Sequence, residues 1–200
     1  MDIIRYAELK PRPWRNGGGV TRELARFPAA AGNPAADESW DWRVSIAEVT
    51  RAGPFSSFAG MERVLTVVDG ELLLLTVDGA EHPLEKYRPF RFSGDAEAAG
   101  ALPTGDIRDL NVLTRTGAFK GYTSIIELSK KRAHPVFGGQ LGILLQGQAN
   151  VSAGADGGAG ADGGAETLGR YDAVVGSDTG TPGILGRGFL AVVSIDAVED

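Results

Sequence analysis

The sequence predicts an all-β protein built as a duplicated jelly roll. Its apolar segments are short, and 29 glycines and 10 prolines punctuate them along the chain. Several segments alternate apolar and polar residues with a period of two, which is typical of strands with two different faces. Helix signals are weak, and the best candidate is a short turn near residues 55–61. Many short strands at fairly regular spacing favour a sandwich or a barrel.

The first half of the chain contains the clearest strand signals. In residues 40–49 one face carries Trp42, Val44 and Ile46 and the other begins with Arg43 and Ser45. The dipeptide Asp69-Gly70 between two apolar runs is the strongest hairpin signal in the sequence. The strands expected in this half are 20–25, 40–49, 64–68, 71–77, 89–92 and 110–114.

The second half is expected to form a similar barrel. Residues 65–74 and 143–151 each contain an apolar run, a glycine turn at Gly70 or Gly147, and a second apolar run, which favours a duplication. We expect a boundary near 116–120, with an N-terminal barrel at 1–116 and a C-terminal barrel at 117–200. The strands expected in the second half are 122–128, 142–145, 149–152, 173–175 and 189–195.

One segment departs from the strand pattern. Residues 153–166 contain only Gly, Ala and Asp before a final Glu, with no large side chain. Such a segment buries too little surface to offset its ordering entropy, so we expect a flexible hairpin loop. A calcium-binding loop is the alternative, because Asp-Gly turns recur in it.

Composition and charge exclude several functional classes. The net charge of −6 and the lack of a concentrated basic face argue against a nucleic-acid partner. The absence of cysteine excludes disulfides, thiolate chemistry and cysteine-based zinc sites. No apolar run is long enough for a signal peptide or a membrane span, so we expect a cytoplasmic protein that has no membrane partner.

The segment that ends at Gly70 resembles the first motif of cupin domains. In that motif His-x-His is followed by four residues, then Glu, then six residues and Gly. Aligned on Gly70, the Glu position falls on Arg63 and the two His positions fall on Ser56 and Phe58. A guanidinium has no acceptor atom and a phenyl ring has no donor atom, and both histidines of the chain lie outside this segment. We therefore expect no metal and no cofactor.

Arg63 in the barrel interior would be a buried cation, which is costly without an anionic partner. Arg43, beside Ser45 and Ala47, could supply a second guanidinium, and its small neighbours leave room for a ligand. Arginine binds carboxylates with two parallel hydrogen bonds, so a ligand carboxylate or phosphate is one candidate partner. The alternative is a set of structural salt bridges, for which the candidate acids are Glu23, Glu48, Glu62 and Asp109.

Residues 14–23, W-R-N-G-G-G-V-T-R-E, contain three successive glycines. Glycine permits positive φ angles and a close approach of the backbone to another group. One interpretation is a wall of a ligand site, with the Asn16 side chain and backbone N–H groups facing the ligand. The other is a tight loop that leads into the first strand. The lysine spacing of a phosphate-binding loop is absent.

Several blocks in order resemble the HutD/Ves family: W-R-N-G-G-G-V-T-R-E, W-D-W-R-V-S-I-A-E-V, G-P-F-S-S-F-A-G-M-E-R-V-L-T-V-V-D-G, F-S-G-D and D-L-N-V-L-T-R. The resemblance is strong over residues 1–115. It implies a bicupin fold, an association with histidine utilisation, and a regulatory or accessory protein that binds a small acidic metabolite such as N-formylglutamate or urocanate. The expected ligand-binding residues are Trp14, Asn16, Arg43, Ser45, Ser56, Arg63, Asp109, Asn111 and Arg115.

Two other functions stay open at this point. A metal-independent cupin enzyme, an isomerase or a hydrolase acting on a small carboxylate, would need a general base, for which Glu48, Asp109 and Tyr122 are the candidates. A homodimer that pairs through sheet edges would cover otherwise exposed strands.

Overall fold

The structure is a computed structural model, which describes residues 1–28, 40–154 and 164–199. Most of the loop expected at 153–166 lies outside the described residues. The chain divides into two compact units. The N-terminal unit comprises Lys10–Tyr122 with residues 196–200, and the C-terminal unit comprises Met1–Leu9 with Thr123–Ile195. The boundary between the units falls after residue 122, six residues later than the expected boundary after residue 116. Residues 1–9, which were expected in the N-terminal barrel, belong to the C-terminal unit.

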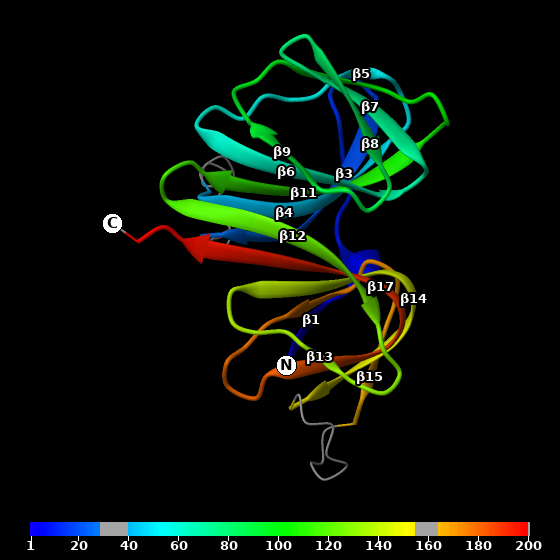
Figure 1. Cartoon of the computed structure of the whole chain (residues 1–200), viewed down its shortest axis with the longest axis vertical. Helices are drawn as coiled ribbons and strands as arrows, with labels where there is room; N and C mark the ends of the chain where they lie inside the picture. The colour runs from blue at the N-terminus through cyan, green and yellow to red at the C-terminus, as the bar shows by residue number, and fades with distance from the viewer. Residues whose placement is uncertain (29–39, 155–163, 200) are drawn as a thin grey trace. The chain divides into compact units, whose positions relative to one another are not determined.

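The N-terminal unit consists of two antiparallel sheets (Figure 1). The larger has the order β2-β3-β4-β11-β6-β9 and the smaller the order β5-β10-β7-β8. Their bounds are β2 Arg12–Pro13, β3 Gly19–Phe27, β4 Trp42–Val49, β5 Gly53–Pro54, β6 Met61–Asp69, β7 Leu72–Val77, β8 Ala80–Glu85, β9 Phe90–Ser93, β10 Ala98–Ala101 and β11 Ile107–Arg115.

Apolar side chains from both sheets form one core in this unit. Leu65 and Val67 of β6 pack in the same cluster as Leu73 and Leu75 of β7, and all four are fully buried. These residues alternate along their strands, as the period of two requires. The interior of the jelly roll therefore lies between the two sheets. Residues two positions from Leu65 along β6 face the same interior.

Three sequence-based expectations for this unit are wrong. Strands β8 and β10 were missed because β8 is polar and contains a proline, and β10 consists of alanine and glycine. The short turn near 55–61, the best helix candidate, is not helical: a tight turn at residues 59–60, closed by the Met61 N–H and the Phe58 carbonyl at 3.1 Å, follows a non-helical segment. The backbone N–H groups of Phe55 and Phe58 donate to the carbonyls of Ala98 and Gly94, at 2.9 and 2.7 Å, so this segment follows a neighbouring strand.

The C-terminal unit contains one sheet with the order β1-β16-β14-β17-β12, in which β13 also pairs with β17 and β15 with β14. Residues 1–9 contribute β1 and a short 3-10 helix, η1, the one helical element among the described residues. The bounds are β1 Asp2–Ile4, η1 Tyr6–Glu8, β12 Phe119–Leu128, β13 His134–Pro135, β14 Gln140–Ala153, β15 Glu166–Leu168, β16 Ala173–Val175 and β17 Pro182–Ala197.

The hairpin expected at Gly147 is wrong, and with it the proposed match between 65–74 and 143–151. Strand β14 continues through Gly147, which pairs with Gly188 of β17. The φ angles of these two glycines are 102° and 111°. A Cβ on either residue would lie 2.0 Å from a carbonyl oxygen of the opposite strand. The glycines therefore permit a close approach of two strands rather than a turn.

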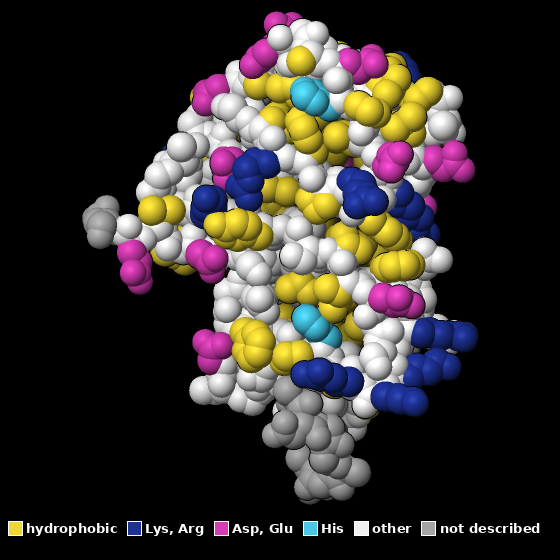
Figure 2. All heavy atoms as spheres, in the orientation of Figure 1, with side chains coloured by type: hydrophobic (Ala, Val, Ile, Leu, Met, Phe, Trp, Pro, Cys, Tyr) yellow, Lys and Arg dark blue, Asp and Glu magenta, His cyan; other side chains and the backbone are white. Residues whose placement is uncertain are grey.

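The two histidines lie on strands rather than in turns. His82 is on β8, with its ring centroid 4.6 Å from that of Phe90, and His134 is on β13. Partial burial lowers the pKa of His134. Both side chains reach the surface in Figure 2. No helix in the described part of the chain has the length and hydropathy needed to cross a membrane.

A buried carboxylate connects residues 1–9 to the rest of the C-terminal unit. Asp172, with 8% of its side chain exposed, accepts hydrogen bonds from Arg5 Nη1 at 2.8 Å and from the N–H groups of Tyr6 and Gly169 at 2.9 Å. Arg5 also pairs with Glu166, whose side chain is 51% exposed. Asp172 therefore satisfies three donors that belong to two distant parts of the sequence.

Asp172→Ala should destabilise the protein by about 2–4 kcal/mol, because two N–H groups lose their acceptor and Arg5, which keeps the Thr167 carbonyl and Glu166, loses its buried carboxylate. Glu166→Ala is the matched control, since it removes a carboxylate from the same arginine at an exposed position and should cost less than about 1 kcal/mol. Urea unfolding measures both values. Equal losses for the two variants would contradict the structural role assigned to Asp172.

Candidate functional site

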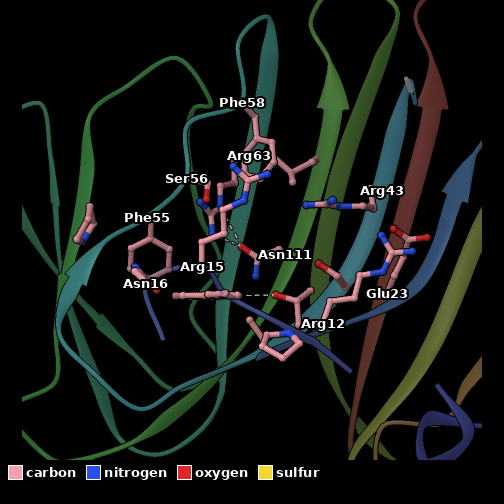
Figure 3. Close-up of a pocket in the computed structure, with 17 residues that line it drawn as sticks. Arg12, Arg15, Asn16, Glu23, Arg43, Phe55, Ser56, Phe58, Arg63 and Asn111 are labelled. Atoms are coloured by element: carbon pink, nitrogen blue, oxygen red, sulfur yellow. Dashed lines mark hydrogen bonds between the residues drawn. The ribbon is translucent and has the colours of Figure 1, made fainter. Parts of the chain in front are cut away.

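A cavity of about 570 Å³ opens in the N-terminal unit (Figure 3). Among the described residues that line it, four carry guanidinium groups and one, Glu23, carries a carboxylate. Aromatic rings and small side chains form most of the remaining wall. The lining residues are Arg12, Pro13, Trp14, Arg15, Asn16, Thr21, Glu23, Arg43, Ser45, Ala47, Pro54, Phe55, Ser56, Phe58, Arg63, Asn111 and Leu113.

The strand register determines which side chains meet at this cavity. Leu65 of β6 is opposite Asn111 of β11, which is opposite Ser45 of β4, which is opposite Glu23 of β3. Arg63 precedes Leu65 by two residues and therefore faces the same side of the sheet. One inward-facing row thus crosses four strands, and three of its members line the cavity together with Arg63.

Arg63 is held in place by a chain of buried polar groups. It is 5% exposed, and its Nε and Nη2 donate to Asn111 Oδ1 at 2.9 and 2.6 Å. The amide nitrogen of Asn111 donates in turn to Asp109, which is fully buried. Asn111 and Asp109 are two residues apart on β11, so the pleat places both on the inward face. The network fixes the direction of the guanidinium.

Burial affects the two charged ends of this network in opposite ways. It lowers the pKa of Arg63 to about 10, although the Asp109 carboxylate opposes this effect and Arg43 adds to it. Arg63 therefore remains protonated at neutral pH. Burial raises the pKa of Asp109 to about 6, against the attraction of Arg63 and the hydrogen bond from Asn111. The carboxylate thus changes its charge near neutral pH.

Aromatic rings surround the buried guanidinium. The Arg63 Cζ atom lies 5.1 Å from the ring centroid of Phe55, 5.5 Å from that of Phe92 and 5.9 Å from that of Phe58. Arg43 lies over Trp40 at 4.6 Å. Ring faces attract cations, and they offer an apolar surface on which the body of a ligand can pack.

The triple-glycine segment forms one wall of the cavity. Trp14 donates from Nε1 to Thr21 Oγ1 at 2.8 Å and meets Phe55 edge-on at 5.9 Å. A Cβ on Gly19 would lie 2.5 Å from the carbonyl oxygen of Glu48 and 3.0 Å from the Trp14 ring. Gly19 is therefore needed because the indole packs directly on the backbone. The Asn16 side chain accepts from the Gly18 N–H at 2.9 Å, which folds the loop locally.

Most of the residues expected at the site line this cavity, and two do not. Arg115 is exposed, and it pairs with Asp41 at 2.6 Å and with the Trp40 carbonyl at 3.1 Å. Asp109 lies behind Asn111 and does not reach the cavity wall. The expected residues that line the cavity are Trp14, Asn16, Arg43, Ser45, Ser56, Arg63 and Asn111.

Three of the acids considered as salt-bridge partners, Glu23, Glu48 and Glu62, form ion pairs with arginines other than Arg63. Glu48 pairs with Arg22 and Arg108, and Glu62 pairs with Arg91. Arg63 donates instead to the side-chain amide of Asn111, which in turn donates to the buried carboxylate of Asp109. Its charge is therefore balanced indirectly, and part of the guanidinium faces the cavity.

The positions that bind metal in the cupin motif carry different chemistry here. Ser56, Phe58 and Arg63 all line the cavity, and together they provide a hydroxyl, a ring and a cation. In the described part of the chain no three His, Cys, Asp or Glu side chains are grouped so as to hold a metal ion. The candidate general bases Glu48, Asp109 and Tyr122 are absent from the described lining residues.

The sequence interpretation missed several lining residues. Arg15 belongs to the 14–23 segment already singled out, Arg12 lies two residues before that segment, and Phe55 adjoins Ser56. Glu23 was considered only as a salt-bridge partner. The signal that could have identified it is its period-two relation to Thr21 on the first strand, since both side chains face the cavity.

Comparisons with known proteins agree with this architecture. The HutD family model matches residues 6–191. Protein Ves of Citrobacter koseri is 34% identical over 146 residues, which cover 70% of this chain and 71% of that protein. The structure of HutD from Pseudomonas fluorescens SBW25 in a formate condition superposes with a TM-score of 0.75 at 29% identity and covers 99% of both chains.

More distant structures share the fold alone. Vicilin from hazelnut, Corylus avellana, superposes with a TM-score of 0.66 at 9% identity, covering 98% of this chain and 85% of that chain. The all-β architecture and these neighbours confirm the predicted cupin jelly roll. With the family match over nearly the whole chain, the protein belongs to the HutD/Ves family.

Proposed function

We propose that this cupin-fold member of the HutD family binds a small acidic metabolite in the Arg63 cavity and acts as a regulatory or accessory protein. The family name associates it with histidine utilisation. The observation that supports the proposal most directly is a buried guanidinium that faces a cavity and is held by an amide rather than by a carboxylate. The cytoplasmic location expected from the sequence is part of the same proposal.

The geometry of Arg63 suits a carboxylate ligand. Its Nε and Nη2 are engaged by Asn111, and among the described residues none accepts a hydrogen bond from Nη1. A carboxylate at Nη1 would gain a charge-assisted hydrogen bond in an environment of low dielectric constant. Arg43 on the same wall adds a second positive charge. The cavity volume of about 570 Å³ is within the range of small-molecule sites.

The general bases considered from the sequence are not on the described wall of the cavity. Its one carboxylate among the described residues is Glu23, and the three side chains considered as general bases lie elsewhere. N-formylglutamate and urocanate, the ligands suggested by the family, are both small carboxylates that such a cavity could accommodate. The structure of HutD from Pseudomonas fluorescens is described as a formate condition, and formate is the simplest carboxylate of this class.

Isothermal titration calorimetry should detect binding of at least one of urocanate, N-formylglutamate, glutamate and formate at millimolar concentration or below. Arg63→Met should weaken that binding by about 10- to 100-fold, because it removes the charged donor while keeping most of the volume. Arg63→Lys, which keeps the charge beside Asp109 but loses the planar fork, should weaken it as well. Lack of binding by all four compounds would refute the proposed ligand class.

Arg115→Met is the matched control for Arg63→Met. Arg115 lies in the same family block as Asn111 but pairs with Asp41 outside the cavity. The control should leave the affinity unchanged within about twofold, since exposed pairs contribute little. A loss of affinity equal to that of Arg63→Met would contradict the assignment of the cavity as the binding site.

Carboxylate binding should become weaker as the pH rises from about 5 to about 8. A second anion beside Arg63 reduces the attraction that Asp109 feels, so the pKa of Asp109, about 6 in the free protein, should rise further on binding. The bound state then holds the proton more tightly, and by linkage affinity is highest where Asp109 is protonated. Formate, which stays ionised over this range, should bind about three- to tenfold more weakly at pH 8 than at pH 5.

Asp109→Asn tests this linkage, because the amide keeps an acceptor for Asn111 but does not titrate in this range. The variant should bind formate with a constant affinity across the same pH range. If the pH dependence of the variant matches that of the wild type, another group is responsible.

A further inference from the structure

Glu23 is the one carboxylate among the described residues that line an otherwise cationic cavity, and the proposed function leaves it unused. Its ion pair with Arg26 Nε is long, at 3.4 Å, and 22% of its side chain is exposed. A carboxylate has about four acceptor positions, so this contact leaves most of them available. Glu23 can therefore accept hydrogen bonds from a ligand.

The strand order separates Glu23 from Arg63. Glu23 is on β3 and Arg63 on β6, with β4 and β11 between them. Three strand spacings place the two backbones roughly 14 Å apart across the sheet. Figure 3 shows the two side chains on different sides of the cavity. Both side chains line the cavity, so a cation and an anion face it from different strands.

The floor between these two groups has a row of large side chains and a row of smaller ones: Leu113 and Arg43 follow Arg63 across the sheet, whereas β4 carries a small residue in the row of Glu23. Ser45 of β4 is directly opposite Glu23 in the register, and Ala47 is the next inward residue of the same strand. Ser45 and Ala47 are both buried and both line the cavity. Phe55 and Phe58 form an apolar wall beside Arg63. A planar or slender ligand body can thus lie over the small residues of β4 and against the rings.

We infer that Glu23 is a specificity-determining residue, which selects carboxylates carrying an N–H donor at the end opposite the carboxylate. This inference rests on the proposed function, in which Arg63 takes the carboxylate. A ligand with an N–H at its far end gains a hydrogen bond to a charged acceptor. A ligand without one leaves the Glu23 carboxylate partly desolvated without compensation, which disfavours binding. The ligand class is therefore a bipolar molecule, with an imidazole or an amide N–H as examples of the far group.

A comparison of two acrylates with different rings tests the inference. Urocanate carries an imidazole N–H, and 3-(2-furyl)acrylate has a ring of similar size without one. By calorimetry the wild type should bind urocanate about 10- to 100-fold more tightly than the furyl compound, the range for a hydrogen bond to a charged group. Glu23→Met should abolish that preference by weakening urocanate alone. Glu23→Gln, whose amide oxygen still accepts, should keep part of the preference.

Glu48→Met is the matched control, because Glu48 lies on the same sheet but pairs with Arg22 and Arg108 outside the cavity. It should leave the preference for urocanate unchanged. Glu23→Gln keeps an acceptor for Arg26, so it supplies the measurement if Glu23→Met does not fold.

The outcomes separate this inference from the proposed function. If Arg63→Met weakens both probes while Glu23→Met leaves their affinity ratio unchanged, carboxylate binding stands and the role of Glu23 is refuted. Equal affinity of the wild type for the two probes refutes that role as well. If the wild type binds neither probe nor any other carboxylate tested, both proposals fail together.

Discussion

The N-terminal unit is organised around the burial of one positive charge. Arg63 is 5% exposed inside a barrel in which its neighbours Leu65 and Val67 on the same face of β6 are fully buried apolar side chains. A cation in such a place is unfavourable unless its donors are satisfied and its charge is balanced. Asn111 satisfies two donors and Asp109, one step behind, balances part of the charge. The interior of the barrel is therefore a polar network fixed within an apolar core.

The indirect balance of charge has consequences for chemistry. A carboxylate bound directly to Arg63 would occupy the whole fork and close the site. An amide between the two ions instead leaves one edge of the guanidinium facing the cavity, and it raises the pKa of Asp109 by leaving this carboxylate buried and only partly compensated. The anion binding that we propose would thus be coupled to proton binding through three side chains on two adjacent strands. Of these three side chains, Arg63 stands where the metal-binding cupin motif has its glutamate ligand.

The wall opposite this network depends on close packing of the backbone. Trp14 can lie against β3 only because Gly19 has no side chain, and the indole then meets Phe55. Ser45 and Ala47 keep the floor between Asn111 and Glu23 free. In the C-terminal unit a similar constraint acts at Gly147 and Gly188, where two strands approach too closely for any Cβ. Small residues thus shape both units by allowing close approach, and in the N-terminal unit they leave a cavity.

The sequence by itself determined the all-β fold, the cupin frame and the face of the 40–49 strand that carries Arg43 and Ser45, because a period of two fixes which side chains share a face. Family blocks also located most of the cavity wall. Tertiary structure decided the rest. A motif block does not show how far along a strand a cavity extends. Asp109 shares the inward face with Asn111 but lies behind the cavity wall, and Arg115, near the other end of the strand, lies outside the cavity. Local glycine patterns do not distinguish a turn from a close strand pair, as Gly147 shows. Glu23 and Arg63 line one cavity because the strand order brings together residues that are far apart in the sequence. No local pattern specifies that order.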